Sequence, residues 1–452
     1  MRTSLRWARG PRLRLIALFT VTALVVAACG NGEEPPPDEP PAEEPPAEEP
    51  DDAVEEPEEP TEIAADFGVD VENQVLRIGA LDDLDGPGSG IGVPYAIGKQ
   101  ILVEQVNSGA LDILPEGWTI DLIQRDHEYN PAESVRAFNE IKDDVLFFAT
   151  TFGTPNTLPL VEDATREEIT LFPASLSSEL AVNDYTPPIG APYKVESHHA
   201  VQFAIEDAEA RDDIDEPVLG ILYQLDDYGE DGIQGIREAA EFHGIELDES
   251  LLIGLAPGET DVAGAITTLQ GGGATHVLLT ILPSSTGPVL GTAAQLEYFP
   301  IWLGNTPAWL DVFFNPEVLP PPVYQNFRWA TGLPLWGEDI GWMDEFLAAY
   351  DEFGSDAHPP DFYILASYAQ GLLELEAFSR ALANGDVTRA GYHEALRSID
   401  DFDAFGLFYQ PIDLTNVPYV TQTDTRILAP GEDLTDWQVV QDFRTPDSWV
   451  GL

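Results

Sequence analysis

Histidine and acidic clusters are the residues of this chain whose types and spacing could support metal chemistry. His198 and His199 are adjacent, so on a helix their side chains point about 100° apart and cannot chelate one ion. The other five histidines are scattered. The run from Asp82 to Gly86 resembles the start of a calcium loop but lacks its further ligands. We interpret this run as an acidic rim and predict no metal site.

A glycine-rich segment from Gly86 to Gly92 would follow a strand and open a helix, as a dinucleotide-binding loop does. Its glycines do not fit GxGxxG, because Val93 takes the last position counted from Gly88 and Ile91 takes it counted from Gly86. The chain has no Gly-x-Ser-x-Gly elbow and no HExxH helix. We predict no cofactor, no catalytic residue and no enzymatic activity, although a dispersed carboxylate pair could hide among so many acids.

The N-terminus has the order of a secretion signal. Five arginines precede an apolar run from Leu15 to Ala28, which is too short for a comfortable membrane span. The sequence from Val26 to Cys29 (Val-Ala-Ala-Cys) resembles a bacterial lipobox, which implies cleavage before Cys29 and lipid attachment to its thiol. Cys29 is the only cysteine, so no internal disulfide can form. The alternative is that Cys29 is one more small residue of an ordinary signal.

Residues 30–62 contain 15 acidic residues and ten prolines, with few residues that could enter a core. Such a segment is predicted to be a disordered, extended tether, with a reach of up to roughly 100 Å at about 3.1 Å per residue. It suits passage through a wall or surface layer. A docking tail for a basic partner is the alternative interpretation.

The remainder of the chain is also strongly acidic. Residues 1–62 hold 15 of the 81 acidic and 5 of the 20 basic side chains, which leaves 66 acidic and 15 basic, a formal charge of −51 for residues 63–452. This charge excludes nucleic acid as a partner, because phosphates would be repelled. It fits a protein that works in salt, where screening weakens self-repulsion. About 390 residues suggest two or three units, each with its own core.

From Val75 onward, short β-rich runs alternate with amphipathic stretches, which predicts parallel sheets with helices on both faces. One set of alternations runs from Val75 to Pro173 and a second from Ser197 to Leu303. Helical patterns then follow at Gly341–Phe353, Asp361–Ala383 and Arg389–Ser398. The last β-like segments, for which the first sheet is the natural host, are Leu407–Pro411, Tyr419–Ile427 and Trp437–Phe443.

Several short motifs in this order resemble one known family. They are Ile78 to Leu81 followed by Asp85 to Gly88, Asp126 with Pro131 to Ser134, the strand and turn from Leu222 to Gly229, and the turn from Pro257 to Asp261. Together they are similar to periplasmic binding proteins of the leucine/isoleucine/valine-binding type over residues 75–445. This resemblance implies the type 1 periplasmic binding fold, with two doubly wound, Rossmann-like α/β lobes and a ligand cleft between them.

The resemblance also implies how the chain is divided. Residues 1–29 are a lipoprotein signal and 30–62 the tether. Residues 75–195 and 331–421 would form the first lobe, and 196–330 with part of 422–452 the second. The chain would cross between lobes three times, near Val195, near Ala330 and near Thr421 to Thr423. The expected protein is a monomeric, extracytoplasmic, lipid-anchored protein that captures a small solute by cleft closure and delivers it to the permease subunits of an ABC importer.

The family's binding positions map onto loops at the strand ends. The resemblance implies that ligand contacts come from Ile91, Phe152, Gly153, Thr154, Ala174, Ser175, Leu176, Tyr228, Ser284, Asn305 and Thr306. Thr154 and Ser175 could instead cap helices, and Tyr228 could be a packing residue. Phe152, Tyr228 and Trp309 are expected stacking surfaces.

Two positions depart from the family's amino-acid binders. Those proteins usually present an acid to the ligand's ammonium group where this chain has Thr306, and a hydroxyl where it has Leu176. Burying an unpaired ammonium is costly, so a neutral amide, an apolar carboxylate or an aromatic compound fits better than an amino acid. Asp311 or Glu338 could take over the acidic role. Two functions of other classes stay open: a tethered ligand sensor of a signalling system, and a hydrolase on the same scaffold.

Overall fold

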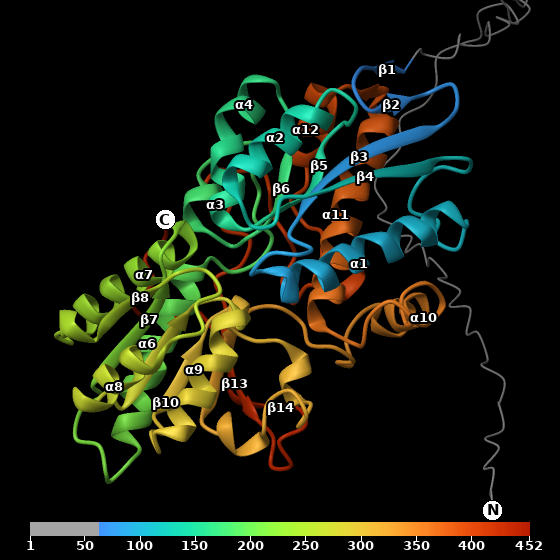
Figure 1. The fold of residues 1–452 in the computed structure, drawn as a ribbon. Coiled ribbons are helices and arrows are strands. Elements are labelled where there is room, and N and C mark those ends of the chain that lie inside the picture. The colour runs from blue at the N-terminus through green and yellow to red at the C-terminus, as the bar shows by residue number, and fades with distance from the viewer. Residues whose placement is uncertain (1–62) are drawn as a thin grey trace, which may run out of the picture. The chain divides into compact units, whose positions relative to one another are not determined.

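The computed structural model describes residues 63–452, which contain two main β-sheets, each flanked by helices (Figure 1). The predicted signal, the predicted lipidation at Cys29 and the predicted tether lie outside the described residues. Between residues 63 and 452, no helix has the length and apolar character needed to span a membrane. We call the first sheet and its helices lobe I, and the second sheet and its helices lobe II.

The sheet of lobe I is built around a long central strand, β3, which pairs in parallel with β4 on one side and with β5 on the other. A short strand, β2, runs antiparallel at the start of β3, and β6 extends the sheet beyond β5. The strands are β2 (Val69–Asp70), β3 (Val75–Asp82), β4 (Thr119–Asp126), β5 (Phe148–Phe152) and β6 (Leu171–Ala174). The predicted first set of parallel strands is therefore present.

Helices of lobe I come from two separate stretches of the chain. The first stretch supplies α1 (Ser89–Asn107), α2 (Pro131–Ile141), α3 (Thr154–Thr157), α4 (Val161–Arg166) and α5 (Ser178–Ala181), and the second supplies α10 (Met343–Phe353), α11 (Phe362–Asn384) and α12 (Arg389–Arg397). The Asn130 side chain caps the start of α2 by accepting a hydrogen bond from the Ala132 N–H. A two-stranded sheet of β1 (Ala64–Ala65) and β12 (Asp386–Val387) joins the first described residues to the segment before α12.

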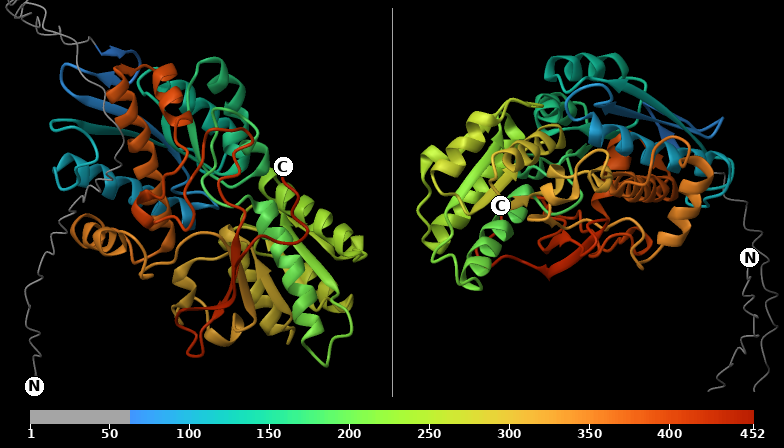
Figure 2. Two further views of the ribbon diagram at one scale, coloured as in Figure 1. Left: turned by 180° about the vertical axis from the view of Figure 1, so that it is seen from behind. Right: turned by 60° about the horizontal axis from the view of Figure 1, so that its bottom comes forward.

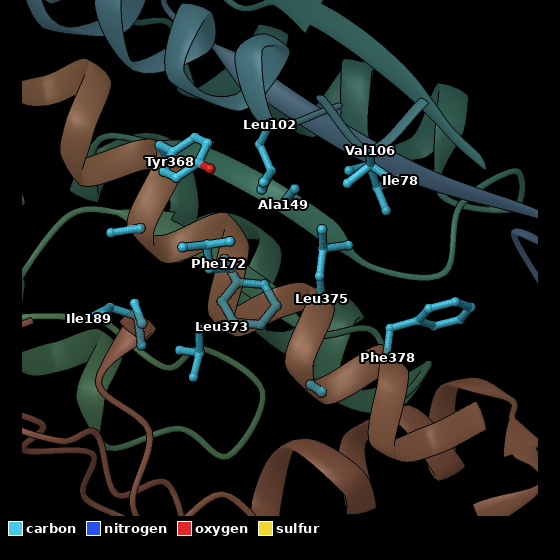
Figure 3. Close-up of a cluster of buried hydrophobic side chains, with 14 of the residues drawn as sticks. Ile78, Leu102, Val106, Ala149, Phe172, Ile189, Tyr368, Leu373, Leu375 and Phe378 are labelled. Atoms are coloured by element: carbon cyan, nitrogen blue, oxygen red, sulfur yellow. The ribbon is translucent and has the colours of Figure 1, made fainter. Parts of the chain in front are cut away.

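The core of lobe I joins these two stretches. Helices α1 and α11 lie side by side against the sheet (Figures 1 and 2). Figure 3 shows the buried side chains between them, including Leu102 of α1, Ile78 of β3 and Leu375 of α11. Gly98 permits this close approach, because a Cβ atom there would lie 2.2 Å from the carbonyl oxygen of Ile364 in α11.

The sheet of lobe II has seven strands in the order β14, β13, β11, β10, β9, β7, β8. They are β7 (Leu219–Gln224), β8 (Leu252–Leu255), β9 (His276–Thr280), β10 (Ile301–Gly304), β11 (Phe327–Thr331), β13 (Thr425–Pro430) and β14 (Trp437–Arg444), and the helices beside them are α6 (Tyr193–Glu209), α7 (Asp227–His243), α8 (Ala263–Gly271) and α9 (Pro283–Gln295). The five strands from β7 to β11 are parallel, as the second alternation predicts.

The C-terminal segments differ from the prediction made from their β pattern in two respects. β13 pairs antiparallel with β11 and β14 with β13, so they extend the sheet of lobe II, the lobe to which the resemblance assigned part of 422–452. The sheet of lobe I, favoured by the β pattern, is not their host. Leu407–Pro411, expected to be a strand, forms none. The chain turns sharply just before it, with positive φ at Ala404, Phe405 and Gly406, and only an isolated bridge joins Phe402 to Ile412. A β-rich composition did not reveal this turn.

Three segments pass between the lobes and are hydrogen-bonded to one another. The first lies between α5 and α6, the second between β11 and α10, and the third before β13. The Thr421 hydroxyl of the third accepts from the Gly190 N–H of the first (2.9 Å), and the Gln422 amide donates to the Gly332 carbonyl of the second (2.9 Å). The crossings therefore form one linked hinge.

Candidate functional site

A cavity of about 70 Å³ lies where the carboxyl ends of the strands of both sheets approach each other beside the hinge. It has room for roughly five water molecules. This is the expected position of a ligand site in open α/β sheets. Its 21 lining residues are Ile91, Tyr95, Tyr129, Phe152, Gly153, Thr154, Pro173, Ala174, Ser175, Leu176, Ile189, Tyr193, Tyr228, Leu282, Thr306, Pro307, Leu333, Tyr363, Ala366, Gln370 and Phe408.

The structure brings together nine of the eleven residues that the sequence analysis assigned to ligand binding. The exceptions are Ser284 and Asn305. Ser284 lies in the first turn of α9, where its hydroxyl is near Gly258 of a neighbouring loop. Asn305 lies behind the wall, where its side-chain oxygen accepts a hydrogen bond from the Tyr228 hydroxyl (2.7 Å). Asn305 therefore supports a lining residue.

The Asp-Tyr-Gly turn places Tyr228 in the cavity. Asp226 is the N-cap of α7 and accepts from the N–H groups of Tyr228 and Gly229. Gly229 lies against the backbone of Gln224, where an added Cβ atom would be only 2.0 Å from the carbonyl oxygen. The helix can therefore start immediately after β7, and the Tyr228 ring lies 5.0 Å from that of Tyr193 at an angle of 66°.

Three hydroxyl groups of the wall lie close together. The Thr154 and Ser175 hydroxyls are 2.7 Å apart and buried. Burial raises the pKa of Tyr193, and its hydroxyl lies close enough to Ser175 to offset part of that increase. Thr154 and Ser175 come from the ends of neighbouring strands β5 and β6, which explains why two loops separated in sequence meet here.

An acid stands directly behind Thr306. Glu196 of α6 accepts hydrogen bonds from both the N–H (2.9 Å) and the hydroxyl of Thr306. The Glu196 side chain is buried, and burial raises its pKa to about 8. The position that lacked an acid in the sequence therefore has one in the next layer. Its carboxyl group is separated from the cavity by Thr306.

Four tyrosines of the wall were missed by the sequence analysis. They are Tyr95 in α1, Tyr129 before α2, Tyr193 at the start of α6, and Tyr363 at the start of α11. An aromatic residue in an apolar helix pattern indicates a core position, and nothing in that pattern shows that these helix ends converge.

Three further residues considered for ligand recognition do not line the cavity. Trp309 is fully buried in an aromatic cluster with Phe313 and Trp437, so it offers no stacking surface. Asp311 accepts a hydrogen bond from the Phe362 N–H. Glu338 forms an ion pair with Arg426 (2.7 Å). Neither acid takes the place of Thr306 in the wall.

Hydrogen bonds join the lobes across the cleft at several points, and two sets of them involve the end of β7 and the first turns of α7. The Tyr129 hydroxyl of lobe I donates to the Asp226 carboxylate of lobe II (3.2 Å) and accepts from the Gln224 amide (3.1 Å). The Ser178 N–H and hydroxyl donate to the Asp231 carboxylate (3.2 and 3.3 Å). The lobes are therefore in contact beside the cavity.

Comparison with known proteins assigns the chain to a family. The family model described as "Periplasmic binding protein" matches residues 75–423. The chain therefore belongs to the periplasmic binding protein family, which confirms the resemblance and the type 1 fold predicted from its motifs. No curated protein sequence matches it.

Solved structures share the fold. A fatty acid ABC transporter substrate-binding protein from Thermomonospora curvata aligns with a TM-score of 0.77 and 22% identity over 85% of this chain and 96% of its own. A branched-chain amino acid ABC transporter protein from Thermus thermophilus with bound valine aligns with a TM-score of 0.70 and 20% identity over 83% and 98% of the two chains. A possible leucine/isoleucine/valine-binding protein from Rhodopirellula baltica gives 0.70 and 19% over 82% and 98%.

Proposed function

We propose that this protein is the extracytoplasmic, lipid-anchored substrate-binding protein of an ABC importer. The observation that supports this best is the cavity itself, because its wall combines strand ends of both lobes with residues of the hinge segments. A ligand in such a cavity contacts both lobes only when they are close together. Its binding energy therefore favours the closed form, which is the form that a permease can distinguish.

The sequence supports the membrane attachment. The lipobox-like segment ends at Cys29, and residues 30–62 provide a tether long enough to hold the lobes away from the membrane. Two of the structural relatives are described as ABC transporter proteins, for fatty acids and for branched-chain amino acids. We extend the transport role, but neither ligand, to this chain.

We propose Thr154, Ser175, Tyr228 and Thr306 as ligand contacts, together with apolar neighbours in the wall, which are Ile91, Phe152 and Leu176. The proposed solute is a small organic molecule with a mainly apolar surface, because aromatic and aliphatic side chains dominate the wall. Apolar burial supplies most of the affinity and the few polar groups orient the molecule. No residue of the wall is assigned a catalytic role.

The experiment is a thermal-shift measurement on the purified full-length protein, in high salt, with leucine, short amides, fatty acids, aromatic acids and organic amines. A ligand that binds only the folded state must raise the melting temperature, by an amount that grows with its concentration. We expect at least one of these classes to do so. A folded protein that responds to none of them contradicts the role in solute capture.

A further inference from the structure

The cavity wall is unusual in its concentration of aromatic rings. Tyr95, Tyr129, Tyr193, Tyr228 and Tyr363 surround it from both lobes, and each is less than a tenth exposed. Phe152 adds a sixth ring, with its centroid 6.4 Å from that of Tyr129. Among the described residues that line the cavity there is no lysine, arginine, histidine, aspartate or glutamate. Aromatic faces are therefore the main electrostatic feature that a ligand meets.

Most hydroxyl protons of the wall are already donated to the protein. Tyr95 donates to Gln370 (2.8 Å), Tyr129 to Asp226, Tyr228 to Asn305, and Tyr363 to the Thr306 carbonyl (2.8 Å). Thr306 donates its own proton to Glu196. The Gln370 amide is likewise engaged, with Ala149 and Glu374. These bonds fix the rings and direct the donors away from the cavity.

Of the hydroxyl groups in the described wall, only that of Tyr193 and one of the Thr154 and Ser175 pair retain a proton for a ligand. One proton is used between Thr154 and Ser175, and Tyr193 lies beside Ser175. A carboxylate has about four lone-pair sites and no cationic partner in this wall. The free hydroxyl protons of the wall are therefore fewer than the lone-pair sites of a carboxylate.

Carboxyl groups form the next layer around the rings. Glu196 and Asp226 lie behind Thr306 and Tyr129, and neither forms an ion pair with a basic residue among residues 63–452. Burial raises the pKa of Glu196 to about 8, and a cation in the cavity would favour its ionised form. The Asp226 carboxylate and the formal charge of −51 on residues 63–452 therefore favour a cation over an anion in the cavity.

We propose that the solute captured in this cavity is a small organic cation, a quaternary or fully substituted ammonium compound held against the tyrosine rings. This inference rests on the proposed function, because it names the ligand class of the same site. A substituted ammonium group has no N–H to satisfy, needs no carboxylate in direct contact, and is attracted to the faces of aromatic rings. Its methyl groups also bury apolar surface. The absence of an acidic residue at position 306 is then explained, since a ligand of this class does not need a carboxylate in direct contact.

The decisive experiment compares three probes of matched shape by isothermal titration calorimetry in the same high-salt buffer. Choline is the cation, 3,3-dimethylbutan-1-ol is its neutral isostere with carbon in place of nitrogen, and 3,3-dimethylbutanoate is an anion with the same bulky group. We expect choline to bind at least tenfold more tightly than the alcohol, and the carboxylate to bind weakest. Because shape is held constant, the difference reports the charge.

Two variants locate the interaction. In Tyr228→Leu, an aromatic face is removed while apolar volume is kept, and we expect a loss of about tenfold in choline affinity with little change for the alcohol. Tyr228→Phe keeps the ring and loses the hydroxyl's bonds to Asn305 and to the Ile281 carbonyl, so it should retain most choline affinity. Tyr193→Leu is a second ring variant, for use if Tyr228→Leu does not fold. Equal losses for choline and the alcohol would contradict the role of the ring faces.

The outcomes separate this inference from the proposed function. Tighter binding of the alcohol or the carboxylate, or binding of leucine or a fatty acid in preference to choline, would overturn the organic cation and support solute capture. Failure of a folded protein to bind any probe of any class counts against both. Choline binding that is unchanged in both leucine variants would show a cation site elsewhere and would also overturn the inference.

Discussion

Tyr129 combines two roles in one side chain. Its ring lines the cavity, and its hydroxyl is the link between lobe I and the Asp226 and Gln224 side chains of lobe II. It follows Glu128, and both residues have positive φ, a conformation that is uncommon outside glycine. A strained turn that places one ring at the lobe boundary suggests that its position matters for closure.

We predict that Tyr129→Phe shifts the ligand-free protein toward open lobes. The ring stays in place, but the two hydrogen bonds across the cleft are lost, which should cost the closed form about 1 kcal/mol. The distance between fluorescent labels on exposed positions of α2 and α8 should increase on average. Tyr368→Phe is the matched control, because it removes a hydrogen bond to Gln105 within lobe I (2.6 Å). An unchanged distance in Tyr129→Phe would show that its hydroxyl does not hold the lobes together.

Whether a lining residue could be predicted depends on whether its position is set by a local motif or by the packing of distant elements. Thr154, Ser175 and Tyr228 follow strand ends, where a short motif and the topology together determine the position. Tyr95 and Tyr363 lie in α1 and α11, far apart in the sequence, and their rings meet at the wall only because the two helices pack together. No local motif records that packing, so these two lining residues could not be predicted.

At the scale of elements, helices α1 and α11 are held together by a buried ion pair as well as by apolar packing. The Lys99 ammonium is 2.6 Å from the Glu374 carboxylate, and both side chains are almost fully buried. Burial raises the pKa of Glu374 to about 7, although Lys99 opposes this. Gln370 connects the pair to Tyr95 at the cavity wall. The packing of the two helices and the position of that ring are therefore coupled.

We predict that Lys99→Met lowers the free energy of unfolding by about 3 to 5 kcal/mol at pH 8, because it leaves Glu374 buried without its partner. The double variant Lys99→Met/Glu374→Leu should recover much of this loss, since no unpaired charge remains. Urea denaturation at constant salt measures both. Arg136→Met, which disrupts an exposed ion pair, is the control and should change stability by less than about 1 kcal/mol. Equal stability of Lys99→Met and the wild type would contradict a stabilising pair.

The order of elements could be predicted because each strand and helix has its own local pattern. The partners of the last two strands could not be predicted from their pattern, since alternation in β13 or β14 does not specify which sheet edge it joins. β11 offered the free edge in lobe II, next to the third crossing. The β pattern alone favoured the sheet of lobe I, and this was wrong because the pattern does not show which sheet edge is free.

At the scale of the whole molecule, the surface carboxylates and the buried acids both make the folded protein less stable at high pH. Burial raises the pKa of Asp82 to about 7, of Asp83 to about 6 and of Asp231 to about 6. The same cause raises the pKa of Glu196 to about 8. Each of these groups binds its proton more tightly in the folded protein than in the unfolded chain, whose acids titrate at about pH 4. Their protonation therefore favours the folded state.

Buried histidines, in contrast, make the folded protein less stable as the pH falls. Burial lowers the pKa of His127 to about 4 and that of His199 to about 4. In the unfolded chain a histidine binds its proton at about pH 6.5. Below that pH the unfolded state gains protons at these positions that the folded state does not, which lowers the stability. Above about pH 6.5 the gain from protonating the buried acids is therefore not opposed by the histidines.

We predict that the melting temperature rises as the pH is lowered from 8 to about 6.5. Over this range the folded state takes up protons at Glu196 and Asp82 while the unfolded acids stay ionised, so stability is gained as pH falls. Added salt should raise the melting temperature at pH 8 as well, because it screens the formal charge of −51 on residues 63–452. Calorimetry at both pH values, with low and high sodium chloride, measures the two effects. A protein that is most stable at pH 8 in low salt would contradict the assignment of these buried acids, because neither their raised pKa values nor the repulsion among surface carboxylates could produce that optimum.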